Sequence, residues 1–403
     1  MLPLQSLTYS LPYILVFILL YVVALPVTTR QGALVNRIPQ VQFLFLTLFF
    51  FIGLRGYIFT DWKLYLPFWE SCPSLWDGFF SIERYLDHGA FSYWEKGFLL
   101  YTIVLKSFSN NWIFFQSVSF SIDFIVLYYF FRRYVSNNIF LAFTFWYMFS
   151  GVIGLSFSIN LMRSAKALLF FLLSIKYVEE KKFVKYLIMN GIGYLFHTSS
   201  ILLLPLYFVL KSRWNFRFIF TLFLLGNIVY LLQIRWIVPV IDIVANLIGG
   251  RLSQLASYYI NNSRWNFSYG ISIGFMERTA TFILLFYLRN KLSAKNAGHV
   301  FINIFYLYIF SYLYLSELRI LIDRIPIMFV CSYWILLPRL YKNLKKEYKA
   351  IFLVSFFFYS LVKGVIAHKD ILALYDNMLF QEFTIQERLE MYNLYKSSEY
   401  WIN

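Results

Sequence analysis

A succession of long apolar runs, separated by short polar connections, constrains this chain more than any other feature of its sequence. A transmembrane helix needs about 20 predominantly apolar residues, and fewer where surrounding protein covers its ends. Runs that meet this requirement lie near residues 9–27, 40–54, 112–131, 138–157, 164–178, 183–196, 198–210, 218–234, 271–288, 299–315, 320–337 and 350–366. The pattern predicts an all-α, polytopic integral membrane protein with about 12 transmembrane helices.

The composition indicates the same class of protein. Of the 403 residues, 60% are hydrophobic and 14% are charged, whereas about 25% of the residues in a soluble domain are charged. Phe, Tyr and Trp make up 23% of the chain, which suits many spans with aromatic belts at their ends. A disordered chain and a nucleic-acid-binding domain are therefore excluded. The net charge of +16 is interpreted as the basic loops of a membrane protein.

The sequence lacks the common motifs for cofactors and metals. Only Cys72 and Cys331 are present, far apart in the chain, so neither a disulfide framework nor a cysteine metal site is expected. There is no P-loop, no Rossmann glycine pattern and no HExxH motif, and the chain has only four His. We therefore expect no cofactor and no metal.

Basic connections orient the predicted spans, because short loops rich in Lys and Arg stay in the cytoplasm. Six segments carry 19 of the 36 basic residues: 28–40, 132–133, 176–185, 211–217, 289–295 and 339–349. With these in the cytoplasm, both termini, the loop 55–111, the loop 235–270 and the tail 367–403 lie on the outer side. We expect residues 1–403 to form a single integral membrane domain.

Two segments affect the number of spans. Residues 97–108 are too short for a span and carry Lys106, so they are interpreted as an interfacial or re-entrant helix in the outer loop. Residues 183–210 could form one long helix, but a single crossing would place the basic segment 211–217 outside. A hairpin that turns near His197 is therefore preferred.

Arginines are frequent on the predicted outer side. They are Arg55, Arg84, Arg163, Arg235, Arg251, Arg264, Arg319 and Arg324. An Arg side chain can bind two phosphate oxygens at once, which Lys cannot do, so this group indicates a phosphorylated ligand at the outer surface. The alternative is that each Arg pairs with a nearby carboxylate, as Arg319 could with Asp323 four residues later on a helix.

Other polar residues on this side could take part in binding or catalysis. The outer loop places Asp61 and Glu95 among many aromatic residues, which suits a sugar, although membrane anchoring also produces aromatic loops. Arg163 and Lys166 are three residues apart, so they share one helix face and could bind an anion or reach lipid phosphates. His197, in an apolar stretch, could accept a proton near neutral pH or form a structural hydrogen bond.

The order of short motifs in the chain resembles that of the EpsG-like, Wzy-type polysaccharide polymerases. The matching elements are Gly53-Leu54-Arg55, Phe59-Thr60-Asp61-Trp62, Glu95-Lys96-Gly97-Phe98, Asn160 with Arg163-Ser164, Lys181-Lys182-Phe183, Phe196-His197-Thr198-Ser199-Ser200, and Leu374-Tyr375-Asp376-Asn377-Met378-Leu379-Phe380. The resemblance is strongest over roughly residues 50–210. Phe59, Lys96 and Ser164 stand where the family pattern has Gly, Pro and Gln.

This resemblance implies a GT-C-like glycosyltransferase of the bacterial inner membrane, with its active site facing the periplasm. Such an enzyme joins oligosaccharide repeat units carried on undecaprenyl diphosphate into O-antigen, capsule or exopolysaccharide. The implied partners are the lipid-linked oligosaccharide, membrane lipid, and a chain-length regulator and a flippase of the same pathway, with no nucleic acid. Two alternatives stay open, namely a flippase or transporter of the lipid-linked oligosaccharide, and a ligase or acyltransferase that modifies the glycan.

The implied reaction needs positive charge at the diphosphate and a base for the acceptor hydroxyl. Arg163 is expected to be the principal diphosphate clamp, assisted by Arg55, Arg319, Arg324 or Lys166. His197, Asp61 and Glu95 are the candidates for the catalytic base. His197 is preferred because an imidazole can act at neutral pH and because it lies near Arg163 in the predicted topology.

Overall fold

A computed structural model describes residues 3–29, 38–135, 139–148, 153–248, 270–293 and 297–397. Over these residues the chain is helical and contains no strand, only one isolated β-bridge. Its contacts divide it into two compact units, residues 1–207 with 344–397, and residues 208–343 with 398–403. That residues 1–403 form a single integral membrane domain stays a prediction. The basic residues Arg30, Arg37, Arg251 and Arg264 lie outside the described residues.

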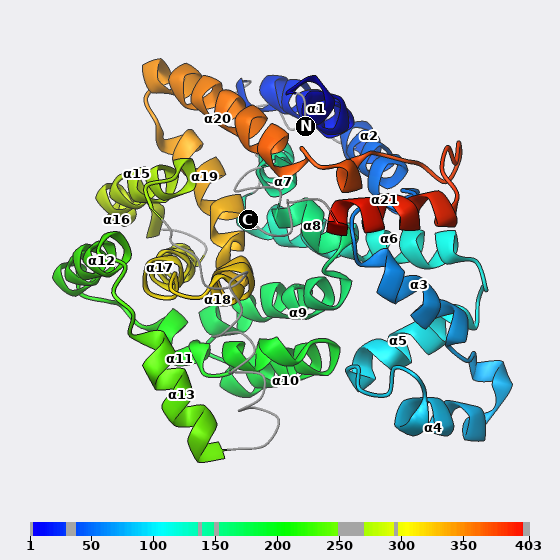
Figure 1. Cartoon of the computed structure of the whole chain (residues 1–403). Helices are drawn as coiled ribbons and strands as arrows, with labels where there is room; N and C mark the ends of the chain where they lie inside the picture. The colour runs from blue at the N-terminus through cyan, green and yellow to red at the C-terminus, as the bar shows by residue number, and fades with distance from the viewer. Residues whose placement is uncertain are drawn as a thin grey trace. The chain divides into compact units, whose positions relative to one another are not determined.

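The first unit contains the N-terminal helices and the C-terminal part of the chain (Figure 1). Its helices are α1 (Pro3–Thr29), α2 (Ile38–Leu48), the π-helix η1 (Phe49–Gly53), α3 (Trp62–Ser71), η2 (Leu75–Asp77), α4 (Phe79–His88), α5 (Lys96–Lys106), α6 (Trp112–Tyr134), α7 (Ile139–Met148), α8 (Ile153–Ile159), α9 (Met162–Glu179), α10 (Phe183–Phe196), η4 (Thr198–Leu203), α20 (Lys346–Ala367), η6 (Ile371–Ala373) and α21 (Ile385–Ser397). Helix α11 (Leu206–Lys211) crosses the boundary between the units.

The second unit is formed by the helices between α11 and α20. They are α12 (Phe216–Leu231), α13 (Ile237–Ile248), α15 (Ile273–Tyr287), α16 (Arg289–Ser293), α17 (Gly298–Tyr314), α18 (Arg319–Arg324), η5 (Pro326–Phe329) and α19 (Cys331–Asn343). Aromatic stacking joins α12 to α15, with ring centroids 3.8 Å apart for Phe223 and Phe282. The buried carboxylate of Glu317 accepts backbone hydrogen bonds at the start of α13, from Trp236 at 2.9 Å and Ile237 at 2.6 Å. This contact satisfies amides that a helix N-terminus leaves without partners.

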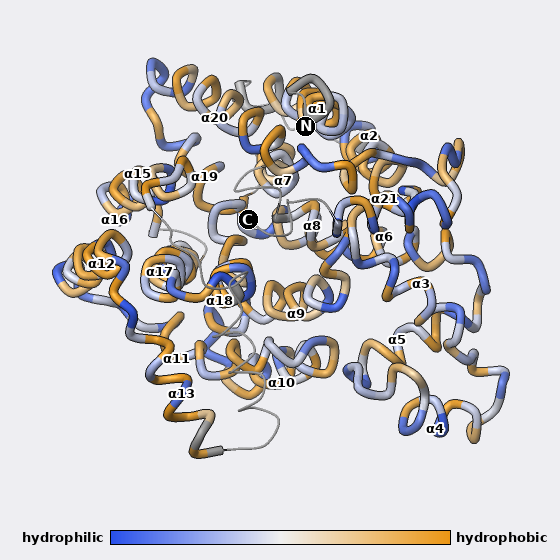
Figure 2. The backbone as a smooth tube through the Cα atoms, in the orientation of Figure 1, coloured by the Kyte–Doolittle hydropathy of each residue, from blue (hydrophilic) through white to orange (hydrophobic). Residues whose placement is uncertain are grey.

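Among the described residues, three helices are long and apolar enough to cross a membrane, namely Leu7–Leu25 within α1, Trp112–Tyr134 and Lys346–Ala367. A fourth candidate consists of Leu321–Phe329 with Cys331–Asn343, which are bent by 46°. Shorter apolar helices cover other predicted runs: Pro39–Gly53, Ile139–Met148, Phe183–Phe196, Phe216–Leu231 and Gly298–Tyr314. Hydrophobic residues predominate along α1, α12 and α20, whereas polar residues gather in many of the connections (Figure 2). By their length and composition, these helices indicate a helical membrane protein.

The predicted hairpin over residues 183–210 is confirmed. Helix α10 ends at Phe196, His197 takes extended backbone angles, and the chain then runs back along α10. The Tyr186 hydroxyl donates to the Leu203 carbonyl at 2.6 Å, and the rings of Phe183 and Tyr207 lie 5.0 Å apart. These contacts join the start of α10 to the end of the returning segment, so His197 lies at the turn.

The predicted short helix over residues 97–108 appears as α5, which has 11 residues. Its apolar side packs into an aromatic cluster shared with α3 and α6, in which the Phe68 and Phe98 ring centroids are 5.6 Å apart. Trp69 contacts Phe115 in the same cluster, at 4.8 Å between centroids. The outer loop is therefore anchored by aromatic burial.

The closing motif of the tail pairs with the first motif of the chain. The Gly56 amide donates to the Asp376 carbonyl, and the Met378 amide donates to the Leu54 carbonyl, each at 2.8 Å. A Cβ on residue 56 would lie 2.7 Å from the Asp376 side chain, so this approach requires glycine. Asp376 also forms a buried ion pair with Arg388 of α21, at 3.6 Å. The pairing holds the tail against the segment that leads into α3.

Candidate active site

Three residues predicted from separate motifs meet in the first unit. The Glu95 carboxylate accepts a hydrogen bond from Arg163 Nη1 at 2.6 Å through Oε2, and its Oε1 lies 2.9 Å from His197 Nδ1. Oε1 also accepts from the Thr198 amide at 3.1 Å. One carboxylate therefore joins an arginine and a histidine that are distant from it in sequence.

The local fold explains why these side chains converge. Glu95 directly precedes α5, Arg163 lies in the first turn of α9, and His197 caps the end of α10. A Cβ on residue 97 would lie 2.6 Å from the Leu195 carbonyl oxygen, so Gly97 allows the start of α5 to approach the end of α10 closely. This approach brings Glu95, two residues before Gly97, to His197, two residues after Leu195.

The surroundings of Glu95 keep its carboxylate ionised. Burial alone would raise its pKa, but the hydrogen bond with His197, the charge of Arg163 and the Thr198 amide together lower that pKa from 4.5 to about 2. Only 8% of the Glu95 side chain is exposed. A carboxylate with so low a pKa is a poor proton acceptor at neutral pH, so Glu95 is suited to hold its two partners in place.

Arg163 has further contacts that sequence reasoning missed. Its guanidinium lies over the Trp94 ring, 4.4 Å from the ring centroid, and its backbone amide lies 3.5 Å from the Tyr65 hydroxyl. Burial raises the pKa of Tyr65 to about 12, so this hydroxyl keeps its proton. The Nε of Arg163 is buried and has no hydrogen-bond partner among the described residues. Trp94 and Tyr65 belong to the aromatic loop noted in the sequence, but nothing in the pattern distinguished them from its other rings.

Asp61, the third acidic or His candidate, lies at the start of α3. Its Oδ1 accepts from the Thr60 hydroxyl at 2.8 Å, and its backbone amide lies 3.5 Å from Asn160 Oδ1. Asn160 belongs to the same motif as Arg163, so the structure connects the Asp61 segment to the start of α9.

Arg55 and Lys166 have partners within the protein. Arg55 is 3% exposed and donates to the carbonyls of Ile52 at 2.7 Å and Ile159 at 3.5 Å. Lys166 forms a buried ion pair with Asp123 and donates to the Ser119 carbonyl at 2.9 Å. In the structure these bonds use both charged groups to connect parts of the protein. The contact of Arg55 and Lys166 with a diphosphate stays a prediction.

Arg319 and Arg324 belong to the second unit, at the two ends of α18. Arg319 Nε lies 3.4 Å from Asp323 Oδ2, and both side chains are about half exposed. This is the i,i+4 pair that the sequence offered as the alternative explanation for Arg319. Arg324 is exposed. For both residues the diphosphate role stays a prediction.

Two departures from the family pattern have structural consequences. Phe59, where the pattern has Gly, adopts φ +61°, a left-handed conformation that glycine takes with little strain. Its amide donates to the Leu372 carbonyl at 2.8 Å. Lys96, where the pattern has Pro, pairs with Asp87 at 3.1 Å and so connects α4 to the start of α5. No structural contact of the third residue, Ser164, bears on the site.

Within the described ranges, no group of three or more His, Cys, Asp or Glu side chains could hold a metal ion.

The apolar helices indicate a helical membrane protein, and its Arg163–Glu95–His197 cluster combines a cation with a potential base. Comparison with known protein families then identifies the family of this chain. The chain matches the model of the EpsG family over residues 40–379, and it belongs to that family. Membership suggests a role as a polysaccharide polymerase. Neither the curated proteins nor the solved structures contain a significant match to this chain.

Proposed function

We propose that this protein polymerises oligosaccharide repeat units carried on undecaprenyl diphosphate, at the outer face of the bacterial inner membrane. The observation that carries the proposal is the Glu95 carboxylate, which holds Arg163 at 2.6 Å and His197 at 2.9 Å. Glycosyl transfer from a diphosphate carrier needs a base for the attacking hydroxyl and a cation for the leaving group. The cluster offers both within one network of hydrogen bonds.

The proposed step is a displacement at the anomeric carbon of the donor sugar. The acceptor hydroxyl oxygen forms a bond to that carbon while His197 Nε2 takes the hydroxyl proton. The bond between the anomeric carbon and the diphosphate oxygen breaks, and its electron pair leaves with the diphosphate. The Arg163 guanidinium stabilises the negative charge that develops there.

Glu95 would prepare both residues for this step. A hydrogen bond from the Nδ1 proton of His197 to Glu95 leaves Nε2 with the lone pair that a base requires. After proton transfer, the carboxylate stabilises the imidazolium. On Arg163 only Nη1 is used by Glu95, and Trp94 orients the face of the guanidinium, so other N–H groups can bind phosphate oxygens.

The proposal also includes the number of membrane crossings and their orientation. About 12 crossings, with the six basic segments in the cytoplasm and a GT-C-like arrangement, would put the cluster at the periplasmic surface. The contacts among Glu95, Arg163 and His197 support this assignment, because charge counting predicted all three on one side. As proposed, the reaction uses no cofactor and no metal.

The test replaces Arg163 with Lys, which keeps the positive charge and removes the guanidinium group that can bind two phosphate oxygens at once. We expect Arg163→Lys to reach the membrane at the normal level while polymerisation falls roughly 100-fold, because a point charge cannot make two-point contact with phosphate. The matched control is Arg133→Lys. It alters another Arg–Glu pair of the same unit, in which Arg133 Nη2 lies 3.3 Å from Glu179.

Activity is measured with purified protein in liposomes, using lipid-linked repeat units as both donor and acceptor. The growth of longer lipid-linked products reports polymerisation, whereas movement of single units across the bilayer without growth would identify a transporter. A ligase or acyltransferase would need a second substrate. If Arg163→Lys elongates chains as fast as Arg133→Lys, the clamp assignment is wrong, and if the wild-type protein forms no chains, the proposed function fails.

A further inference from the structure

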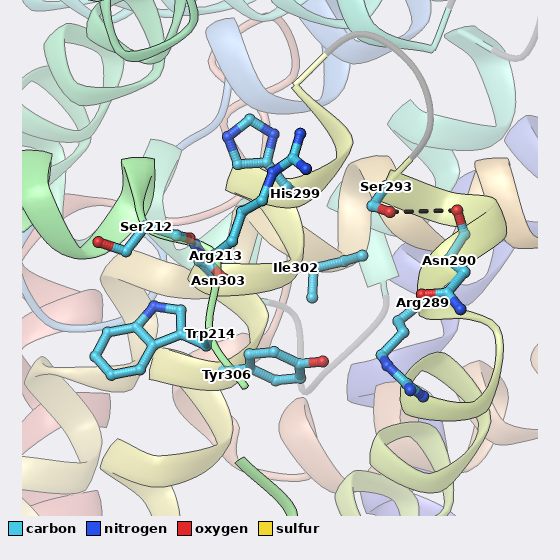
Figure 3. A pocket seen from close by; sticks show the side chains of 10 residues that line it. All are labelled: Ser212, Arg213, Trp214, Arg289, Asn290, Ser293, His299, Ile302, Asn303 and Tyr306. Atoms are coloured by element: carbon cyan, nitrogen blue, oxygen red, sulfur yellow. Dashed lines mark hydrogen bonds between the residues drawn. The ribbon is translucent and has the colours of Figure 1, made fainter. Parts of the chain in front are cut away.

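A basic cavity lies in the second unit and is lined by none of the residues assigned to polymerisation. It has a volume of about 380 Å³, at the lower end of the range of small-molecule pockets. Its lining comes from the segment between α11 and α12, from α16 and from α17 (Figure 3). The lining residues include Arg213, Trp214, Arg289, His299 and Asn303. Sequence analysis placed the segments 211–217 and 289–295 on the same side of the membrane, and the structure brings both to this pocket.

The lining favours an anion. It contains two guanidinium groups, an imidazole and several neutral hydrogen-bonding groups, and no Asp or Glu among the described residues that form it. In Figure 3, Arg213 extends toward the His299 ring, and Arg289 lies on the other side of the view, below Asn290. Arginine on two sides of a cavity is the arrangement that phosphate oxygens require.

Internal contacts hold the arginines in position. The side-chain amide of Asn303 donates to the carbonyls of Leu210 at 3.0 Å and Ser212 at 2.8 Å, which fixes the chain just before Arg213. Arg289 donates to the Phe286 carbonyl at 2.8 Å, and its guanidinium lies 5.2 Å from the Phe216 ring centroid. The backbone before Arg213 and the side chain of Arg289 are thus held by contacts within the protein.

Exposed apolar side chains flank the pocket. Phe216, three residues after Arg213, is 49% exposed, and Tyr287, two residues before Arg289, is 80% exposed. Ile283, one turn earlier on α15, is 55% exposed. A soluble phosphate compound would leave these apolar side chains exposed, whereas the acyl chains of a lipid would cover them.

We propose that this pocket binds the phosphate of an anionic phospholipid headgroup, with Arg213 and Arg289 on the phosphate and the acyl chains along α12 and α15. Basic pockets between membrane helices bind acidic headgroups in this way. The site would fix the second unit in the lipid bilayer and is independent of the reaction proposed for the Glu95 cluster. It contributes no residue to glycosyl transfer.

The test measures lipid retention by the full-length protein. Purified protein is delipidated in detergent and titrated with phosphatidylglycerol or with phosphatidylcholine, and bound lipid is counted by native mass spectrometry. We expect the wild type to bind phosphatidylglycerol more tightly than phosphatidylcholine. Arg213→Gln with Arg289→Gln should weaken phosphatidylglycerol binding roughly tenfold, because each basic residue near a headgroup contributes to its attraction.

The matched control removes two charges from the same connection without changing the pocket lining, as Lys211→Gln with Arg217→Gln. Equal loss in both double variants would mean that net charge alone attracts lipid, and would overturn the proposal. So would displacement of phosphatidylglycerol by an equal concentration of glycerol 3-phosphate, which would identify a site for a soluble phosphate ester. Should the double variant unfold, the single Arg213→Gln gives the same comparison, because Arg213 is exposed.

Discussion

The two units each combine arginine with histidine, but only one places a carboxylate between them. In the first unit Glu95 contacts both Arg163 and His197, and the three side chains form one connected group. In the second unit the pocket that contains Arg213, Arg289 and His299 has no acidic residue in its described lining. The same cationic residue types would therefore have different roles in the two proposed sites.

The difference has a simple electrostatic basis. Glu95 is ionised and offsets the charge of Arg163, so the first group can stabilise a diphosphate as charge develops and release it afterwards. The second pocket has at least two positive charges from its arginines, so an anion bound there would be retained. Turnover suits the first arrangement, and stable binding suits the second.

The largest effect is expected when the proposed base, His197, is replaced. We expect His197→Gln to lower the rate of chain elongation roughly 100-fold, because general-base catalysis contributes about that much. His88→Gln, at an exposed position of α4, is the matched control and should keep full activity. An active His197→Gln variant would move the base to another residue, with Asp61 as the next candidate.

Removing the carboxylate should have a smaller effect on rate and a distinct effect on stability. We expect Glu95→Gln to reduce elongation roughly tenfold, since the amide holds His197 and Arg163 without charge. The native pKa of Glu95 is lowered from 4.5 to about 2, so its ionised form stabilises the fold above about pH 4.5. That contribution is lost as the pH falls toward about 2.

The measurement is thermal unfolding of wild type and Glu95→Gln in detergent, between about pH 7 and about pH 3. The melting temperature of the wild type should exceed that of the variant by a constant amount at neutral pH, and the gap should shrink below about pH 4.5. Glu179→Gln, at a more exposed Arg–Glu pair, serves as the control. A gap that is the same at every pH would show that Glu95 contributes no charge-dependent stability.

Installing a carboxylate in the second pocket should have the smallest effect. Asn290 lines that pocket and is exposed, so Asn290→Asp adds a negative charge with little change in shape. We expect binding of phosphatidylglycerol to weaken roughly threefold while elongation stays normal, because one carboxylate offsets part of the arginine charge. Binding that is unchanged, by the same mass-spectrometric titration, would contradict the importance of charge at this pocket.

Much of the helical organisation could be predicted from the apolar runs. Most of the twelve runs correspond to helices, and the turn at His197 lies where the basic segment 211–217 required it. The run 320–337 is instead divided among α18, η5 and α19, and its two main parts are bent by 46°. Pro326 at the start of η5 cannot donate the backbone hydrogen bond that would continue α18, so α18 ends before it.

The candidate site could be predicted only in part. The motifs pointed to Glu95, Arg163 and His197 as site residues. On the sequence alone Glu95 was a candidate base, whereas the low pKa of its carboxylate suits it to positioning the other two residues. The buried pairing of Lys166 with Asp123 could not be read from sequence, because the partners are 43 residues apart on different helices. The stacking of Trp94 on Arg163 was hidden for the same reason.

The sequence by itself determined the class of protein, since apolar runs of this length and so few charges require a membrane. It also determined which groups were available for chemistry, because the guanidinium of arginine and the imidazole of histidine are fixed by residue type alone. Only the tertiary structure decided which charges are neutralised internally and which remain for a ligand. Pairing depends on the distance between atoms from different helices, and packing at contacts such as Gly97 against Leu195 sets that distance.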